Sequence, residues 1–359
     1  MAVTQQQIAL EAQVPRSTVA AVMSAAQRGR ISPEVRKKVM DAAHRLGYRP
    51  NRYAQVVRNG KSGYIGIINF GALRQLALRK VQVATETIRD LGYDWMVQQA
   101  DWYSHDWARA CDLCVQSLID ARVEGVLLVY PHEFLTQEHI GRFHKAEIPV
   151  VTIAGEHLQG VPKFVSDRQW GYRMITEHLL SLGRQRIVLM SKVKIATANG
   201  FYSAFEGYPA LREQASVVTA TEKRCEEDPC ATVYLPGLRA MREILNAPGP
   251  RPDAVVCTND QWAMGALRAC AEAGVKVPEE IAVTGFDNDT AGAFGTVPLT
   301  TIDHPLEPIS RQAVESLVGM IREKKLLSET TVTVRGKLVI RQSSGALPHP
   351  SLLPNSGTP

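Results

Sequence analysis

Three helix-start signals in the first 58 residues constrain this chain more than any other feature. Residues 4–7, TQQQ, have the pattern of a capping box, in which two side chains satisfy backbone N–H groups at a helix start. Pro15 follows a short turn and suits the first position of a second helix, where its missing N–H is not needed. Residues 32–34, SPE, start a third helix, which Gly47 ends. These signals predict three short helices, the first two joined by a tight turn.

This helical head is strongly basic. Residues 1–62 hold eleven Lys and Arg against three Asp and Glu, a net charge of +8. The whole chain carries +5, which leaves −3 for residues 63–359. A surface that binds phosphates needs such a concentration of positive charge. On charge alone, a basic helical domain that meets another protein is an equally good interpretation.

The turn between the first two helices favours DNA over protein as the partner. In a helix-turn-helix, the second helix lies in the major groove and presents its first turn to the base edges. Here that turn carries Arg16, Ser17 and Thr18. Arg16 can donate two hydrogen bonds to guanine, and the hydroxyls can reach a base edge or a phosphate. We therefore expect double-stranded DNA as a partner.

The composition is that of a globular protein without a membrane span. The sequence is 45% hydrophobic and 21% charged, and no run of about 18 apolar residues occurs in it. Its polar start opens a helix and does not have the pattern of a signal peptide. We expect a cytoplasmic protein.

Neither a metal, a cofactor nor an active site is predicted. Among six cysteines, Cys111 and Cys114 form a lone CxxC, and Cys225 and Cys230 have the wrong spacing for a second zinc-binding pair. We expect reduced thiols. No GxGxxG follows the first strand of the body, so no dinucleotide cofactor is expected. The sequence also lacks a nucleophile elbow, HExxH and a P-loop, and an enzyme is not expected.

The rest of the chain alternates apolar strands with helices. This alternation predicts a parallel sheet with helices on both faces, and the pattern restarts after about residue 157. Two such units predict a two-lobed α/β body that binds a ligand between the lobes, outside the carboxyl ends of the strands. The expected strands are 64–70, 93–98, 125–129, 148–153, 164–166, 186–190, 216–220, 253–257, 281–285 and 331–340, and 201–212 is expected to be one helix.

The head and the body both resemble the lactose-repressor (LacI/GalR) family of bacterial transcription regulators. The resemblance covers about residues 3–345. In the head it rests on Val3-Thr4, Ile8-Ala9, Ala12, Val14, Ser17-Thr18-Val19, Val22, 31–36, Val39, Ala42-Ala43 and the run 46–51, LGYRPN. In the body it rests on Asp167, Gly171, 178–183, Arg186-Ile187, Asn259-Asp260-Gln261, 263–266, Val277-Pro278, 285–288 and 298–302.

The resemblance implies a helix-turn-helix head followed by a two-lobed body like periplasmic binding proteins. It places the DNA-binding domain at 1–58, with a hinge helix at about 50–58. One lobe is expected at 62–157 and 297–324, the other at 158–296 and 325–346, and a disordered tail at 347–359. The tail has no apolar heptads, so we expect a homodimer, which would bind a near-palindromic operator.

The resemblance, together with the positions of residues after strand ends and on the first turn of the second helix, predicts which residues contact DNA and the effector. Those expected at DNA are Thr4, Arg16, Ser17, Thr18, Arg28, Tyr48, Asn51, Ala54 and Val57, with Val57 as the apolar wedge in the minor groove. The family's effectors make a carbohydrate the expected ligand. Residues expected at the effector are Phe70, Asp101, Arg168, Thr197, Asn259, Trp262 and Asp287. For Asn259 a helix cap, and for Trp262 a packed core aromatic, are equally good interpretations.

Some positions depart from the family pattern. In the head, Ala20 and Ala21 replace a usual Ser-Arg, and Val57 replaces a usual Leu. In the body, Ala154 and Thr197 stand where Asp and Arg are usual. The resemblance therefore implies a transcription regulator of the repressor type, but it identifies neither the operator nor the effector. A sugar-binding sensor that no longer reads DNA is the alternative.

Overall fold

The computed structural model describes residues 3–23, 31–48, 62–70, 75–99, 106–192, 195–220, 229–326 and 329–345. It divides into two compact units, 1–62 and 63–359, which are called the head and the body below. The predicted hinge helix, the predicted tail and the predicted site residues Arg28, Asn51, Ala54, Val57 and Asp101 lie outside the described residues. No described helix is long and apolar enough to cross a membrane.

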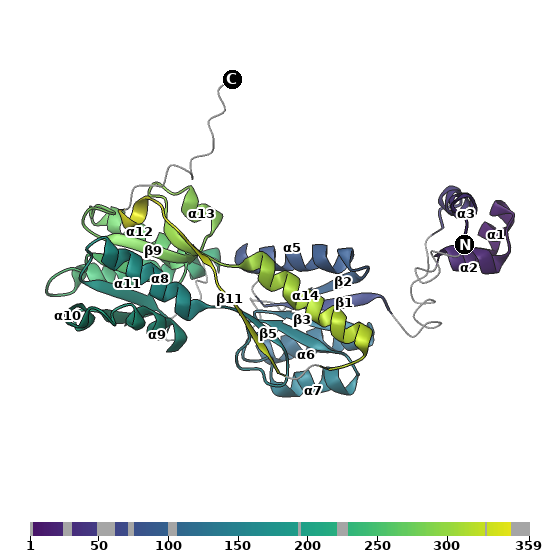
Figure 1. The fold of residues 1–359 in the computed structure, drawn as a ribbon, viewed down its shortest axis with the longest axis horizontal. Helices are drawn as coiled ribbons and strands as arrows, with labels where there is room; N and C mark the ends of the chain where they lie inside the picture. The colour runs from purple at the N-terminus through teal and green to yellow at the C-terminus, as the bar shows by residue number, and fades with distance from the viewer. Residues whose placement is uncertain are drawn as a thin grey trace, which may run out of the picture. The chain divides into compact units, whose positions relative to one another are not determined.

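The head contains the three predicted helices, α1 (Gln5–Ala12), α2 (Arg16–Met23) and α3 (Pro33–Arg45) (Figure 1). The capping box forms as predicted, because Thr4 Oγ1 accepts from Gln7 N and Gln7 Oε1 accepts from Thr4 N. Ser32 Oγ accepts from Val35 N at the start of α3. The three helices share one core, formed by Ile8, Ala9, Ala12, Val19, Val22, Val39, Ala42 and Ala43.

The body contains two six-stranded sheets, as the alternating pattern predicts. The first has the order β11-β5-β4-β3-β1-β2, and all its pairings are parallel. Its strands are β1 (Tyr64–Asn69), β2 (Asp94–Gln99), β3 (Gly125–Val129), β4 (Val150–Ile153), β5 (Lys163–Ser166) and β11 (Thr331–Val334). Helices α6 (Trp107–Asp120) and α7 (Gln137–Lys145) cover one face, and α5 (Gln75–Asp90) and α14 (Leu306–Glu323) cover the other.

The second sheet has the order β12-β10-β9-β8-β6-β7, and only β12 runs antiparallel to its neighbour. Its strands are β6 (Ile187–Ser191), β7 (Ser216–Thr219), β8 (Ala254–Cys257), β9 (Ala282–Asp287), β10 (Thr300–Asp303) and β12 (Lys337–Val339). Helices α8 (Arg168–Ser181) and α9 (Ile195–Ser203) pack on one face, and α11 (Leu235–Asn246) and α12 (Asp260–Glu272) on the other. The remaining elements are α10 (Pro209–Arg212), α13 (Thr290–Ala293), η2 (Pro229–Val233) and η3 (Gln342–Ser344).

The first sheet and its helices form the first lobe of the body, and the second sheet and its helices form the second lobe. The chain crosses between these two lobes at three short segments. They are Asp167 between β5 and α8, His304-Pro305 between β10 and α14, and Arg335-Gly336 between β11 and β12. The crossings touch one another. Asp167 N donates to Val334 O over 2.9 Å, and Arg335 Nε donates to Asp167 Oδ2 over 3.2 Å. A Cβ on Gly336 would lie 2.1 Å from the Asp303 carbonyl oxygen, so this position has no room for a side chain.

Each crossing lies later in the chain than the expected lobe boundary. The boundaries at 157/158, 296/297 and 324/325 each precede a strand that still pairs within the lobe being left, namely β5, β10 and β11. The expected strand 331–340 is two strands in different sheets, and β10 was not expected at all. The expected helix 201–212 is also wrong, because α9 ends at Ser203 and Pro209 begins the separate α10. Sheet partners are set by distant parts of the chain, which local patterns do not reveal.

Candidate functional site

The first turn of α2 presents the base-reading residues predicted from sequence. Arg16 and Ser17 are exposed, and Thr18 is half-buried. Val19 and Val22 anchor the opposite face of this helix in the core of the head. The local reason is the order of residues after Pro15, in which three polar side chains precede the first buried valine. Arg16 is thus exposed and accessible to a partner.

Thr4 and Tyr48, also predicted at DNA, have structural partners in the head. Thr4 is exposed, but its hydroxyl caps α1. Tyr48 is half-buried and packs against the helical core. Ala20 and Ala21 are half-buried in α2 and offer no hydrogen-bonding side chain. Among the described head residues, Arg16 and Ser17 therefore form the most accessible polar pair on α2.

In the body, Arg168 lies where the first crossing enters α8, and its contacts fix its guanidinium. Its Nη2 donates to Tyr172 Oη over 2.7 Å and to the Thr258 carbonyl oxygen over 2.9 Å. The guanidinium carbon lies 4.5 Å from the centre of the Phe286 ring, in a cation–π contact. Tyr172 Oη donates to the same Thr258 oxygen over 2.6 Å. Arg168 Nε is buried without a hydrogen-bond partner among the described residues.

Lys80, which was not among the residues predicted from sequence, lies buried next to this group. Only 1% of its surface is exposed. Its Nζ donates to Tyr130 Oη over 2.7 Å and lies 3.4 Å from His304 Nε2, in the second crossing. A signal was present in the sequence, because Lys80 shares the apolar face of α5 with Ala77, Ala84 and Ile88. A lysine on the buried face of a helix points to a special environment.

Burial lowers the pKa values of both basic groups at this contact. The pKa of Lys80 falls to about 7, chiefly through loss of hydration, although the negative charge of Asp287 opposes the fall. The pKa of His304 falls well below its usual value through burial and the nearby cations Lys80 and Arg168. His304 is therefore neutral at neutral pH, and Lys80 is divided between its charged and neutral forms.

Asp287 ends β9 and faces the same region as Arg168 and Lys80. It is half-buried, and its φ of 122° is a strained backbone conformation for a residue other than glycine. Its charge acts on the pKa values of both Lys80 and Arg168. The structure thus brings together two predicted residues, Arg168 and Asp287, and adds Lys80 and His304.

The other predicted effector residues lie in structural positions. Asn259 Oδ1 accepts from Trp262 N over 2.9 Å, which makes Asn259 the N-cap of α12. Trp262 has no exposed surface and packs in the core between α11, α12 and the second sheet. Phe70 packs in the core under α6 and α7, and Thr197 is buried in α9. The cap and the core aromatic were the alternatives that the sequence left open.

A second polar network holds the segment that follows Asp287. Buried Asp260 Oδ1 accepts from Thr301 Oγ1, and its Oδ2 accepts from Asp289 N, both over 2.6 Å. Burial raises the pKa of Asp260 to about 7, and the charge of Asp287 adds to this. Gly285 has no room for a Cβ beside Asp260. This network joins the first turn of α12 to β10 and to the segment that follows β9.

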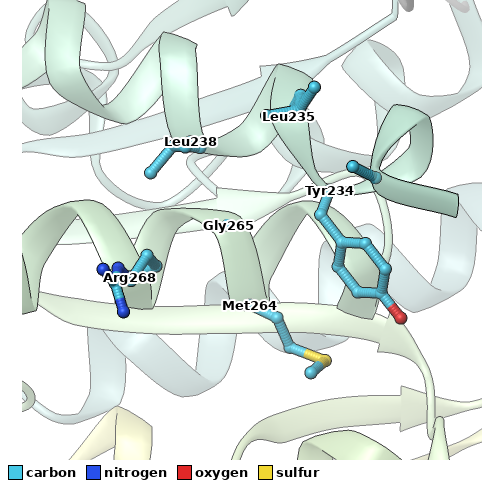
Figure 2. A pocket seen from close by; sticks show the side chains of 7 residues that line it. Tyr234, Leu235, Leu238, Met264, Gly265 and Arg268 are labelled. Carbon is cyan, nitrogen blue, oxygen red and sulfur yellow. The ribbon is translucent and has the colours of Figure 1, made fainter. Parts of the chain in front are cut away.

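An apolar groove lies elsewhere on the second lobe, between α11 and α12. Its volume is about 370 Å³, and Figure 2 shows Tyr234 and Met264 at one end and Arg268 at the other. Its lining consists of Ala231, Tyr234, Leu235, Leu238, Met264, Gly265 and Arg268. The helices approach closely because Gly237 and Gly265 lie against backbone atoms of the opposite helix or its start. None of the residues around Lys80 and Arg168 lines this groove.

Cys111 and Cys114 lie one turn apart on α6 and are buried as free thiols. Burial raises the pKa of Cys111 to about 12, so it is a protonated thiol at neutral pH. Within the described ranges, no cluster of three or more His, Cys, Asp or Glu could hold a metal ion.

Two family models match this architecture. Residues 4–51, the head, match the bacterial regulatory proteins of the lacI family, and residues 176–344 match the periplasmic binding protein-like domain. Over these ranges the chain is similar to LacI-family regulators. Among the relatives, the ribose operon repressor of Halalkalibacterium halodurans is 25% identical, and the match covers 94% of this chain and 96% of that protein. The lactose operon repressor of Escherichia coli is 26% identical over 89% and 84% of the two chains.

Solved structures of the LacI family share the fold. The Lac repressor dimer bound to operator and the anti-inducer ONPF is similar with a TM-score of 0.76 and 24% identity, over 96% of this chain and 100% of that one. The complex of the transcriptional regulator CelR with cellobiose gives a TM-score of 0.65 and 22% identity, over 95% and 99%. At these identities the likeness establishes the fold.

Proposed function

We propose that this protein is a sequence-specific transcriptional repressor whose affinity for its operator is controlled by a carbohydrate effector bound between the two lobes of the body. Similarity to LacI-family regulators supports the coarse assignment, since relatives that match most of the chain are named as repressors of sugar operons. We infer further that an effector binds between the lobes and that its binding changes the affinity of the protein for DNA. We also propose a cytoplasmic location, where the DNA is.

The observation that best supports sequence-specific DNA binding is the exposed Arg16-Ser17 pair on α2, whose opposite face is anchored in the core of the head. Val19 and Val22 fix the helix, and Pro15 begins its first turn, so the polar side chains project away from the core. A charge of +8 in residues 1–62 supplies attraction to phosphates. A helix held in this way can place a bidentate arginine against a guanine in the major groove.

The observation that favours an effector site is the meeting of polar groups from both lobes. Lys80 belongs to the first lobe, Arg168 and Asp287 to the second, and His304 to a crossing between them. A ligand that contacts groups on both lobes favours one angle between them over others. Such a change in population would alter how two first lobes pair in a homodimer, and so how two heads reach adjacent half-sites.

Selection of binding sites from random duplex DNA with the full chain tests this proposal. We expect enrichment of a near-palindrome, because two heads related by a twofold axis read inverted half-sites. Arg16→Ala should cost about 1–3 kcal/mol in binding and relax the preference at one base pair of each half-site. The matched control is Arg45→Ala, which removes the same charge from α3, where Arg45 pairs with Glu11.

The control separates base reading from general attraction. Arg45→Ala should weaken binding to all duplexes alike and leave the preferred sequence unchanged. If no palindrome is enriched, and Arg16→Ala binds DNA like the wild type at moderate salt, the repressor assignment fails. A carbohydrate sensor without specific DNA reading, favoured by the two alanines on α2, would then replace it.

A further inference from the structure

Two cations from opposite lobes lie close together without a carboxylate partner. Lys80 comes from α5 and Arg168 from the start of α8. The partners of Lys80 Nζ are a phenol and an imidazole, and those of the Arg168 guanidinium are a phenol and a carbonyl oxygen. Among the described side chains, neither cation forms a salt bridge. Buried cations in proteins normally pair with carboxylates, because an unpaired charge is costly to remove from water.

Neither of the nearby acids forms a salt bridge with these cations in the described part of the chain. Asp287 and Glu156 act on Lys80 at longer range, and Asp287 also acts on Arg168. The donor Nε of Arg168 and the ring atom Nδ1 of His304 are buried without hydrogen-bond partners in the described part of the chain. Lys80 and His304 are buried, but Arg168 is half-buried, so a molecule that enters between the lobes can reach Arg168 first. The two cations and the Arg168 Nε donor would be satisfied by acceptor oxygens that carry negative charge.

We propose that the effector is an anionic carbohydrate, whose carboxylate or phosphate group binds between Lys80 and Arg168. This inference rests on the proposed function, because it takes the space between the lobes as the effector site. A neutral sugar offers hydroxyls and ring oxygens, which leave the cations without a counter-charge. An acidic or phosphorylated sugar supplies two or three charged oxygens that both lobes can bind at once.

The position of the cations links this anion to the crossings between the lobes. Arg168 directly follows the first crossing, and His304, which contacts Lys80, forms part of the second. An anion held by Lys80 and Arg168 together is bound fully only while the two lobes keep one angle. Its binding energy therefore favours that angle over others.

Binding of an anion should also be accompanied by proton uptake. Lys80 faces Tyr130 just after β3, His304 from the second crossing, Arg168 from α8, Asp287 from β9, and Glu156 after β4. Its pKa of about 7 in this setting means that some molecules carry a neutral lysine at neutral pH. A bound anion favours the charged form, so each binding event draws a fraction of a proton from the buffer.

The test uses the full chain and matched sugars that differ in charge. The probes are glucose, glucuronate and glucose 6-phosphate, then galactose and galacturonate, then ribose and ribose 5-phosphate, with inorganic phosphate alone, all at constant ionic strength. We expect at least one anionic probe to raise the melting temperature while its neutral counterpart does not. Comparison of the carboxylate probes with the phosphate probes identifies which anionic group the site binds. Calorimetric titration in two buffers of different ionisation enthalpy should then reveal proton uptake.

Two variants locate the effect. Lys80→Met should weaken binding of the anionic probe about tenfold or more and abolish the proton uptake. Arg79→Met removes the same charge from an exposed position next along α5 and should change neither. If Lys80→Met does not fold, Arg168→Met replaces it, with the same expected loss of affinity.

The inference is wrong if no anionic probe binds, if a neutral sugar binds as tightly as its charged counterpart, or if the variants keep wild-type affinity. Its failure differs from failure of the proposed function. A neutral effector would leave a selected palindrome intact and overturn only the anion. An anionic ligand bound by a chain that enriches no palindrome would overturn the repressor and keep the anion.

Discussion

The hydroxyl of Thr301 donates to Oδ1 of Asp260 over 2.6 Å, which joins β10 to the first turn of α12. The other carboxylate oxygen accepts from Asp289 N, so one buried side chain holds three segments of the second lobe. Burial raises its pKa to about 7. The folded protein therefore holds a proton here that the unfolded chain, with a usual value of 3.8, has lost.

Replacement of this acid should change the pH dependence of stability. For wild type, this group lowers the free energy of unfolding as pH rises from about 4 to about 7, because the unfolded state binds fewer protons in that window. Asp260→Asn lacks the titration. The free energy of unfolding of the variant relative to wild type should rise by a few kcal/mol across the window, as measured by urea unfolding at several pH values. Parallel stability curves for wild type and Asp260→Asn would contradict the network.

Removal of a buried charge at Lys80 should stabilise the protein. The pKa of Lys80 is about 7 when folded against a usual 10.5, so the unfolded chain binds more protons between these values. Wild-type stability from this group therefore rises with pH over that window. Lys80→Met should unfold with a free energy a few kcal/mol higher at pH 7, and the gain should shrink towards pH 10. Denaturant titration measures it, with Arg79→Met as the charge-matched control. A destabilised Lys80→Met at pH 7 would show that its hydrogen bonds outweigh its burial.

The cap of α3 should control the stability of the head. Ser32 Oγ accepts from Val35 N over 3.3 Å. Ser32→Ala should cost about 1 kcal/mol, seen as faster hydrogen exchange of α3 amides in the full chain. Ser32→Asp should keep the protection, since aspartate caps well and favours the positive end of the helix dipole. Equal loss in both variants would mean that the hydroxyl does more than cap.

Helix contact at the groove should not tolerate a methyl group. A Cβ on Gly237 would lie 2.1 Å from the Trp262 carbonyl oxygen, a backbone atom that cannot turn away. Gly237→Ala should therefore destabilise the protein by about 3 kcal/mol or more in thermal or urea unfolding. Gly319 on α14 has nothing within 4 Å of such a Cβ, and Gly319→Ala should stabilise by about 0.5–1 kcal/mol. Similar losses of stability in both variants would mean that alanine disturbs the helices themselves, and that the contact of Gly237 with the Trp262 backbone is not the cause.

The head could be read from sequence because local rules determine it. The TQQQ capping box, Pro15 and the SPE start each act within four residues, and the helices begin where these signals lie. Most strands of the body were likewise apparent from apolar runs. What local patterns could not reveal was pairing. The sequence of β10, TTID, lacks the apolar run that is typical of a buried strand. The segment 331–340 has the pattern of one strand, although its halves belong to different sheets.

The body site was only partly predictable for a similar reason. Arg168 and Asp287 follow strand ends, which ordinary strand patterns locate. Lys80 becomes important only because α5 brings it against Tyr130 and His304, 50 and 224 residues away in sequence. Asn259 is ambiguous in sequence, since one side-chain oxygen serves equally well as a cap or a ligand contact, and the structure gives it the cap.

The third crossing between the lobes consists of two residues, Arg335 and Gly336. An extended chain of two residues spans at most about 7 Å, so this link acts as a short strap. The lobes cannot translate apart without breaking β11 or β12 out of its sheet. Any motion that a ligand selects is thus reduced to rotation about an axis near the crossings. Small displacements at Lys80, close to that axis, would become larger ones at the far ends of the lobes.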